Sequence, residues 1–184
     1  MKKMVLVVLI GLFLGTAAFA DHPGFGIGIV DNFGWGYGLG VYNNIGLSLK
    51  IPNVPIMWGF YFHSGNNHFG TGVTGDFYII DQNFVNHQAT NEAGESYRFL
   101  LDWYFGPGFL VNMRFWEDNG ALDLGLRLPI GISWHIIPSR DPIDLELFLG
   151  LVPKIGFFNL GQDDWGFGGG VGGEVGLRIF FGAR

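Results

Sequence analysis

The sequence predicts an all-β fold, a transmembrane antiparallel up-and-down β-barrel of eight strands, with ten strands as the alternative. Apolar residues make up 48% of the chain, yet after residue 20 no apolar run approaches the roughly 18 residues of a spanning helix. Apolar and polar residues instead alternate in segments of about ten residues separated by turn residues. A backbone in hydrocarbon must satisfy its own hydrogen bonds, and a closed barrel does so.

The N-terminal segment has the three parts of a secretory signal peptide. Lys2 and Lys3 precede an apolar run of about ten residues, and Ala18-Phe19-Ala20 closes it. The run is shorter than the roughly 20 residues of a membrane helix. We therefore expect a cleavable signal peptide over residues 1–20, cut after Ala20, and a barrel domain over 21–184. The chain has no cysteine, which excludes disulfides, thiolate metal sites and an N-terminal lipid-anchored cysteine.

The charge balance of the exported part is acidic. Loss of Lys2 and Lys3 would leave eight basic side chains against 16 acidic ones. This excess of negative charge argues against nucleic acid or anionic lipid as the main partner.

The second half of the chain carries the clearest alternation. In 122–134 the even positions are all apolar, from Leu122 to Trp134, while the odd positions include Asp123 and Arg127. The same pattern, with weaker examples nearer the N-terminus, predicts strands at 24–30, 45–51, 55–63, 71–80, 99–116, 121–136, 143–156 and 167–181.

Two features favour the ten-strand alternative. Residues 35–41 also alternate, and Gly106-Pro107-Gly108 interrupts 99–116 with a residue that cannot donate to the ladder. The one long polar connection, 81–96, would face the exterior in a ten-strand barrel. Eight strands would place it on the side of the termini.

The composition of the two strand faces predicts which of them points inward. The faces opposite the apolar ones are rich in glycine and carry only one or two charges per strand, as suits a narrow interior. Aromatic residues gather near strand ends, as interfacial girdles require. We therefore expect the apolar faces to meet lipid and the charged residues to line the lumen: Lys50, Asp76, Asp102, Arg114, Asp123, Arg127, Asp144, Glu146, Lys154, Glu174 and Arg178. The alternative is a soluble, lipocalin-like barrel with its apolar face inside.

Charges in a low-dielectric lumen are tolerated when they are paired. We expect a lumen charge network that closes the barrel, comprising Arg114, Asp123, Arg127, Asp144, Glu146, Lys154, Glu174 and Arg178. Within it, Arg127 is expected to meet Arg114 and Glu146 from the two adjacent strands. The alternative for the same residues is a weakly conducting polar path, although an eight-stranded interior holds little beyond side chains.

No catalytic residue, metal site or cofactor is predicted. Ser133 and His135 share the inner face, but Asp123 lies too far along the strand to orient the imidazole. His63 and Ser64 would point to opposite faces of one strand. The short acidic segments 81–83, 118–119 and 163–164 are expected to be solvated loops rather than calcium sites.

The C-terminal strand resembles the assembly signal of outer-membrane proteins, which is polar, x, Gly, x, x, apolar, x, aromatic. Glu174, Gly176, Ile179 and Phe181 match this pattern, although Gly182-Ala183-Arg184 follow where the aromatic residue usually ends the chain. The resemblance implies that the outer-membrane assembly machinery recognises this strand.

Four segments within residues 70–181 resemble spirochaete-type small outer-membrane proteins of unknown function, with an OmpA- or OmpW-like barrel of eight strands. They are Trp103-Tyr-Phe-Gly-Pro-Gly, Leu126-Arg-Leu-Pro-Ile-Gly-Ile-Ser-Trp134, Leu145-Glu-Leu-Phe-Leu-Gly-Leu-Val-Pro153 and Gly176-Leu-Arg-Ile-Phe-Phe181. The resemblance implies a bacterial outer-membrane location, contact with outer-membrane lipid, and loops that meet extracellular or host proteins. It leaves three roles open: a structural or surface-interaction barrel, a narrow channel for small or hydrophobic solutes, and a soluble periplasmic barrel for a lipid-like ligand.

Overall fold

The computed structural model describes residues 24–37, 44–52, 54–65, 68–117, 119–138 and 143–182. The predicted signal peptide lies outside them. Within them, no helix is long and apolar enough to cross a membrane. The regular elements are strands: β1 (Phe25–Tyr37), β2 (Asn44–Lys50), β3 (Met57–Gly65), β4 (His68–Asp76), β5 (Ile80–Thr90), β6 (Ser96–Phe105), β7 (Gly108–Phe115), β8 (Gly120–Arg127), β9 (Ile130–Pro138), β10 (Ile143–Leu160) and β11 (Gly166–Phe181).

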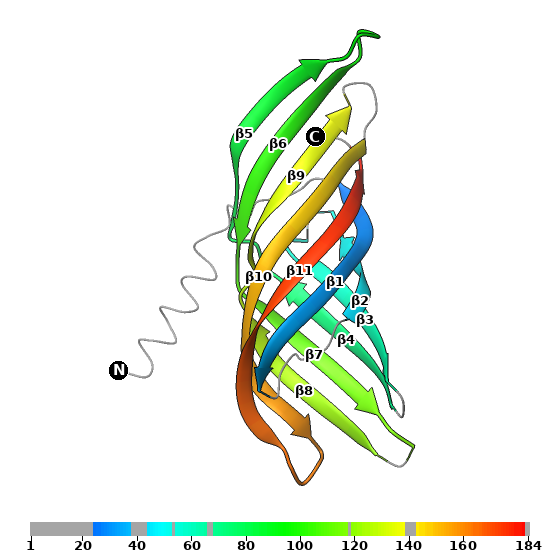
Figure 1. The fold of residues 1–184 in the computed structure, drawn as a ribbon, viewed down its shortest axis with the longest axis vertical. Coiled ribbons are helices and arrows are strands. Elements are labelled where there is room, and N and C mark those ends of the chain that lie inside the picture. The colour runs from blue at the N-terminus through cyan, green and yellow to red at the C-terminus, as the bar shows by residue number, and fades with distance from the viewer. Residues whose placement is uncertain are drawn as a thin grey trace, which may run out of the picture.

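These elements form a closed eight-stranded antiparallel barrel, as the alternation predicted. The pairing runs β11-β1-β2-β3-β4-β7-β8-β10, and β10 pairs with β11 to close the circle. β5, β6 and β9 continue β4, β7 and β8 toward the end of the barrel at which the C-terminus lies (Figure 1). Three of the eight strands are therefore long and interrupted, and β10 spans their length by pairing with β8 along one part and with β9 along the other.

The three interruptions fall at residues 77–79, at Gly106-Pro107 and at Leu128-Pro129. At the last two, neighbouring strands lack a regular ladder. The register is the same on both sides, from Gly108 opposite Arg127 to Phe105 opposite Ile130. Pro107 thus breaks the hydrogen bonding, as a residue without an N–H must, but the chain does not reverse there. β1 also runs without interruption through Trp35. The ten-strand alternative is therefore wrong.

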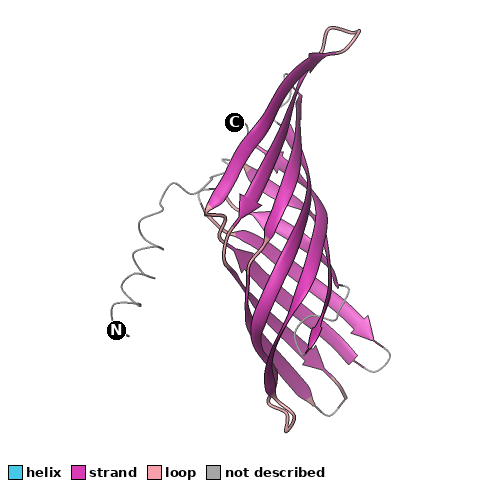
Figure 2. Cartoon of the chain, turned by 60° about the vertical axis from the view of Figure 1, so that its left-hand side comes forward, coloured by secondary structure: helices cyan, strands magenta, loops and turns pink. Residues whose placement is uncertain are grey.

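The segment 81–96, expected as a loop, is mostly strand. β5 pairs with β6 alone and is exposed along nearly all of its length, and the two project beyond the rest of the barrel as a hairpin (Figure 2). Both of its faces meet solvent, so polar residues occupy both faces and the period-two pattern disappears. The hairpin lies at the end of the barrel where β1 begins and β11 ends, as the eight-strand count required.

Burial in this barrel is inverted relative to a soluble protein. Among the described residues, 33 large apolar side chains are exposed, and buried polar or charged residues outnumber buried apolar ones by 15 to 11. The clearest strand shows it directly, because Leu126 is 66% exposed and Arg127 only 5%. The predicted assignment of apolar faces to the outside and charges to the inside is the one the structure shows.

Glycine lines the lumen, as expected for a narrow interior, and here it makes room for inward aromatic rings. A Cβ at Gly176 would lie 2.2 Å from the Phe148 ring, and one at Gly131 would lie 2.3 Å from the Tyr104 ring. Tyr104 stacks on Tyr78 with ring centroids 4.7 Å apart. The interior is therefore filled by rings and charges together, at close packing.

Candidate functional site

The centre of the lumen holds Arg127 between two carboxylates on other strands. Its Nη2 donates to Glu174 Oε2 at 2.5 Å, and its Nε lies 2.9 Å from Asp76 Oδ1 in an ion-pair contact. Tyr104 donates its hydroxyl to the other oxygen of Glu174 at 3.1 Å. All these groups are buried, so the interaction joins β4, β6, β8 and β11 through the middle of the barrel.

A second cluster lies closer to the termini and is centred on Arg178. Its Nη1 donates to Glu146 on the neighbouring β10 at 2.8 Å, and its Nε donates to Ser48 on β2 at 2.6 Å. The guanidinium carbon lies 3.9 Å from the centroid of the Phe148 ring. An arginine contributes both charge and a flat apolar surface in such a contact, and here it fills the cross-section of the barrel.

A third cluster lies toward the opposite end. Arg114 on β7 donates to Asp123 on β8 at 2.8 Å and to the side-chain oxygen of Asn159 on β10. Asn112 donates to the second oxygen of Asp123 at 3.0 Å, and the backbone N–H of Asn159 donates to the first at 3.0 Å. Asp123 is thus fully engaged and balances the charge of Arg114.

The fourth cluster surrounds His135 near the termini. Its Nδ1 lies 3.0 Å from Asp144, and its Nε2 lies 3.3 Å from Ser133 Oγ and 3.5 Å from Asp102. Asn83 donates to Asp102 at 2.7 Å. Serine, histidine and aspartate therefore follow one another as in a hydrolase triad, with Asp144, not the more distant Asp123, beside the imidazole.

The His135 ring lies between two carboxylates, Asp144 at Nδ1 and Asp102 at Nε2. Ser133 is 2% exposed, so a substrate would reach its hydroxyl only if the lumen opened. A catalytic serine needs access to its substrate.

Two lysines, Lys50 and Lys154, line the lumen. Lys50 donates to the backbone carbonyls of Val54 at 2.6 Å and Ile51 at 3.2 Å. Lys154, predicted to join the charge network, stands beside Gly172, where a Cβ would lie 3.4 Å from its Nζ. Lys154 also lines a small central cavity of about 60 Å³ with Asn32, Asn44 and Asp123.

The predicted convergence of Arg127, Arg114 and Glu146 is wrong: the charges form separate clusters. Arg127 faces Lys154 in the register with β10, and Glu146 lies eight residues farther along that strand, roughly 26 Å at the rise of a strand. Arg114 is likewise six residues from Gly108, the partner of Arg127 on β7. Side chains on two paired strands lie at the same level along the barrel axis only where the strand register places them opposite each other. The sequence pattern does not reveal that register.

Several partners were missed, namely Tyr104, Ser48 and Asn159. Tyr104 and Ser48 occupy the lumen-facing positions of their strands. The alternation therefore indicates that they face the lumen, but it does not indicate which charged side chain each of them contacts. Asn159 breaks the pattern with a φ of 54°, a left-handed conformation for which asparagine is one of the few suitable residues besides glycine.

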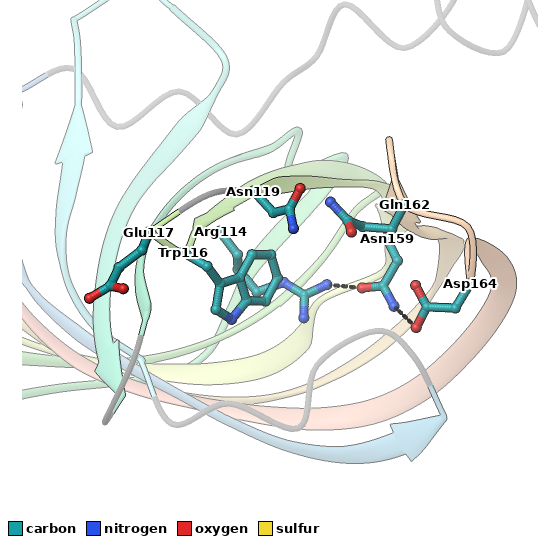
Figure 3. A pocket seen from close by; sticks show the side chains of 7 residues that line it. All are labelled: Arg114, Trp116, Glu117, Asn119, Asn159, Gln162 and Asp164. Carbon is teal, nitrogen blue, oxygen red and sulfur yellow. Dashed lines mark hydrogen bonds between the residues drawn. The ribbon is translucent and has the colours of Figure 1, made fainter.

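The open end of the barrel away from the termini contains a pocket of about 550 Å³ (Figure 3). Its lining joins the Arg114 cluster to the β7–β8 and β10–β11 turns, and includes Trp116, Glu117, Asn119, Gln162 and Asp164. In Figure 3 the Trp116 ring is seen between Glu117 on one side and Asn159, Gln162 and Asp164 on the other.

The four residues that resemble an assembly signal have distinct positions in the folded strand. Glu174 and Gly176 face the lumen, against Tyr104 and Phe148, whereas Ile179 and Phe181 are exposed on the outside. The spacing of these four residues therefore also places small or polar side chains of β11 in the lumen and apolar ones on the outside.

No three acidic or histidine side chains among the described residues are grouped to hold a metal ion. Asp118, in one of the short acidic segments, lies outside the described residues. No protein family, curated protein or solved structure matches this chain in sequence or fold comparison.

Proposed function

We propose that this chain is an integral outer-membrane barrel with a structural or surface-interaction role, whose lumen is closed by ion pairs. The observation that carries the proposal is the inverted burial: apolar side chains cover the outside while charged pairs fill the inside. Soluble monomers rarely expose contiguous apolar patches of more than a few hundred Å², whereas a membrane barrel requires such a surface.

Strand length and aromatic placement support the same proposal. A tilted strand of about 9–11 residues crosses a bilayer, and β10 and β11 have 18 and 16 residues. Exposed aromatic residues lie at both ends of the barrel. Phe25 and Phe181 face each other where β1 begins and β11 ends. A larger group lies at the opposite end, where β1, β3, β7 and β10 end: Trp35, Phe62, Phe69, Phe115, Phe157, Trp165 and Phe167. Such rings suit a membrane–water interface.

The contents of the lumen favour a closed barrel over the channel alternative. The Arg178 and Arg127 clusters occupy successive levels, and Phe148, Phe180 and Val152 are almost completely buried between and beside them. Eight strands enclose little space beyond their own side chains. Conduction would require these clusters to separate.

Two measurements test the proposal. The protein folded in detergent should migrate differently on SDS gels before and after boiling, because a closed barrel resists SDS until it is heated. In a planar bilayer it should show no stable conductance. Purification as a detergent-independent soluble monomer would contradict the membrane location and favour the periplasmic lipid-binding alternative. Steady single-channel currents would favour the narrow channel.

A further inference from the structure

The projecting hairpin of β5 and β6 has a free edge. Strand β5 pairs with β6 on one side, and on its other side it pairs with no strand in the part of the chain that the structure describes. The strand is exposed along nearly all of its length, and it extends beyond the rest of the barrel (Figure 2). An edge strand presents N–H and C=O groups that can pair with another chain.

The turn of the hairpin shows which backbone groups lie on this edge. The N–H of Asn91 donates to the Glu95 carbonyl at 2.9 Å, so these two residues form a hydrogen-bonded pair. Hydrogen-bonded and non-hydrogen-bonded pairs alternate along an antiparallel ladder, and the register is regular over residues 85–90. The N–H and C=O groups that point away from β6 therefore belong to Asn86, Gln88 and Thr90.

Strand β5 has few of the features that prevent pairing at an edge. Native edge strands are protected by lysine, proline, inward charges or bulges. β5 contains no lysine, arginine or proline, and its carboxylate, Asp81, lies at the end nearest the barrel. A bulge occurs at Phe84, but residues 85–90 beyond it form a regular ladder. This outer part of β5 is therefore a suitable template for a further strand.

The side chains beside the edge indicate the pattern that an added strand needs. Val85 and Ala89 lie on the face of the hairpin that also carries Phe99 of β6, which continues the apolar outside of the barrel. Asn86 and Gln88 lie on the opposite, polar face. Cross-strand neighbours on one face interact, so the added strand should alternate apolar and polar residues.

The charges near the tip favour a basic partner. Glu92 is exposed in the turn, and Glu95 follows it. The cation of this hairpin, Arg98, donates to the side-chain oxygen of Asn86 at 3.2 Å instead. Because β5 runs toward the tip, an antiparallel partner would have its N-terminal residues there. A lysine or arginine at the start of the added segment would then meet the two carboxylates, and such complementarity gives specificity.

A second copy of the chain does not fit this edge. Copies in one membrane would be related by an axis along the membrane normal, and the hairpin projects roughly along the axis of the barrel (Figure 1). Two β5 strands would then run in the same direction, whereas identical edges pair symmetrically only when they are antiparallel. This step rests on the proposed membrane location, but the free edge itself does not.

We propose that the free edge of β5 binds an extended segment of another protein by strand addition, antiparallel to β5. Main-chain hydrogen bonds supply the affinity in this mode of recognition, and alternate side chains supply the specificity. The bonds are made to the backbone of Asn86, Gln88 and Thr90. The bound segment alternates apolar and polar residues and begins with basic ones, and it lies on the side of the membrane that holds both termini.

Amide hydrogen exchange, measured by NMR on the detergent-folded protein, tests this inference. The probe is the synthetic peptide Lys-Lys-Thr-Val-Thr-Val-Thr-Val at millimolar concentration. It should slow exchange at the N–H groups of Asn86, Gln88 and Thr90 by about tenfold or more. The N–H groups of His87 and Ala89, which already bond to β6, should keep their rates. N-methylation of the peptide's threonines, whose N–H groups face β5, should abolish the effect, whereas N-methylation of its valines should not.

Two variants locate the site on the protein. Gln88→Pro removes an N–H of the free edge without removing a bond to β6, so the peptide should no longer slow exchange at Asn86 and Thr90. Gln88→Ala keeps that N–H and is the matched control, which should bind as the unaltered chain does. Glu92→Lys should raise the Kd of the peptide severalfold. The heat-dependent gel shift and an unchanged exchange rate at Ala89 confirm that the barrel and the hairpin are folded.

Three results would overturn the proposal. The parent peptide slows no exchange at the edge, or both methylated peptides slow it equally, or the edge is already protected without peptide to an extent that rises with protein concentration. The third result would assign the edge to a second copy of the chain. None of them bears on the membrane location, which the bilayer and gel experiments test independently.

Discussion

Replacement of Arg127 by alanine removes the one cation that, among the described residues, forms ion pairs with the buried carboxylates of Asp76 and Glu174. At 2.9 Å from Asp76 and 2.5 Å from Glu174, each attraction amounts to about 6 kcal/mol at an effective dielectric constant of 20. Desolvation of the guanidinium offsets much of this sum. The net loss of unfolding free energy should be about 3–5 kcal/mol, the cost of leaving buried charge uncompensated.

The measurement is denaturant unfolding in detergent, followed by intrinsic tryptophan fluorescence, with a double-mutant cycle. Arg127→Ala and Glu174→Ala should be coupled by about 2–3 kcal/mol, because the two residues share a contact. Arg127→Ala and Glu146→Ala should add to within about 0.5 kcal/mol, since Glu146 pairs with Arg178 instead.

Full additivity of Arg127→Ala with Glu174→Ala would refute this reasoning. So would a loss below about 1 kcal/mol for Arg127→Ala, the range of an exposed ion pair. Either result would mean that water solvates these charges separately, and the narrow-channel alternative would then gain support.

Three further outcomes follow from the described contacts. Leu126→Arg, on the apolar outside, should lower stability in lipid by about 2–4 kcal/mol, whereas Leu126→Ala should insert normally; equal folding yields in liposomes would contradict the lipid-facing assignment. Gly176→Ala places a Cβ 2.2 Å from the Phe148 ring and should cost about 1–3 kcal/mol by overpacking, while Gly72→Ala, whose nearest neighbour is the Asn112 side-chain oxygen at 3.2 Å, should cost clearly less in the same unfolding assay. Hydrogen bonds from Asn91 and Tyr97 lower the pKa of Glu95 in the projecting hairpin, so their stabilising effect is present above the unfolded-state pKa and is lost as pH falls through the folded-state pKa. NMR titration should show that pKa rising toward its usual value in Asn91→Ala, and an unchanged pKa would disprove the role of Asn91.

Strand phase was readable from the sequence because it depends on local periodicity alone. Alternate residues of a strand point to opposite faces, so the pattern from Leu122 to Trp134 was enough to place Arg127 inside and Leu126 outside. It also indicated eight strands, although the break at Pro107 left a reversal open. That ambiguity is physical: a missing N–H interrupts a ladder whether or not the chain turns.

The polar segment 81–96 lacks the sequence pattern of a strand for a related reason. Strand β5 extends past the barrel, so solvent contacts both of its faces. Its sequence therefore lacks the alternation of apolar and polar residues, although its backbone still pairs with β6. Only the tertiary structure distinguishes such a projecting hairpin from a loop.

The sequence by itself determined which side chains enter the lumen, and the tertiary structure alone decided which of them meet. Arg127 contacts Asp76 and Glu174 rather than Glu146 because strand stagger sets the height of each residue in the barrel, and stagger arises from backbone pairing around the whole circle. The pocket lined by Arg114, Trp116 and Gln162 has the same origin. Trp116 and Gln162 come from the β7–β8 and β10–β11 turns, which are distant in sequence, and the pairing of β8 with β10 brings those turns to one rim.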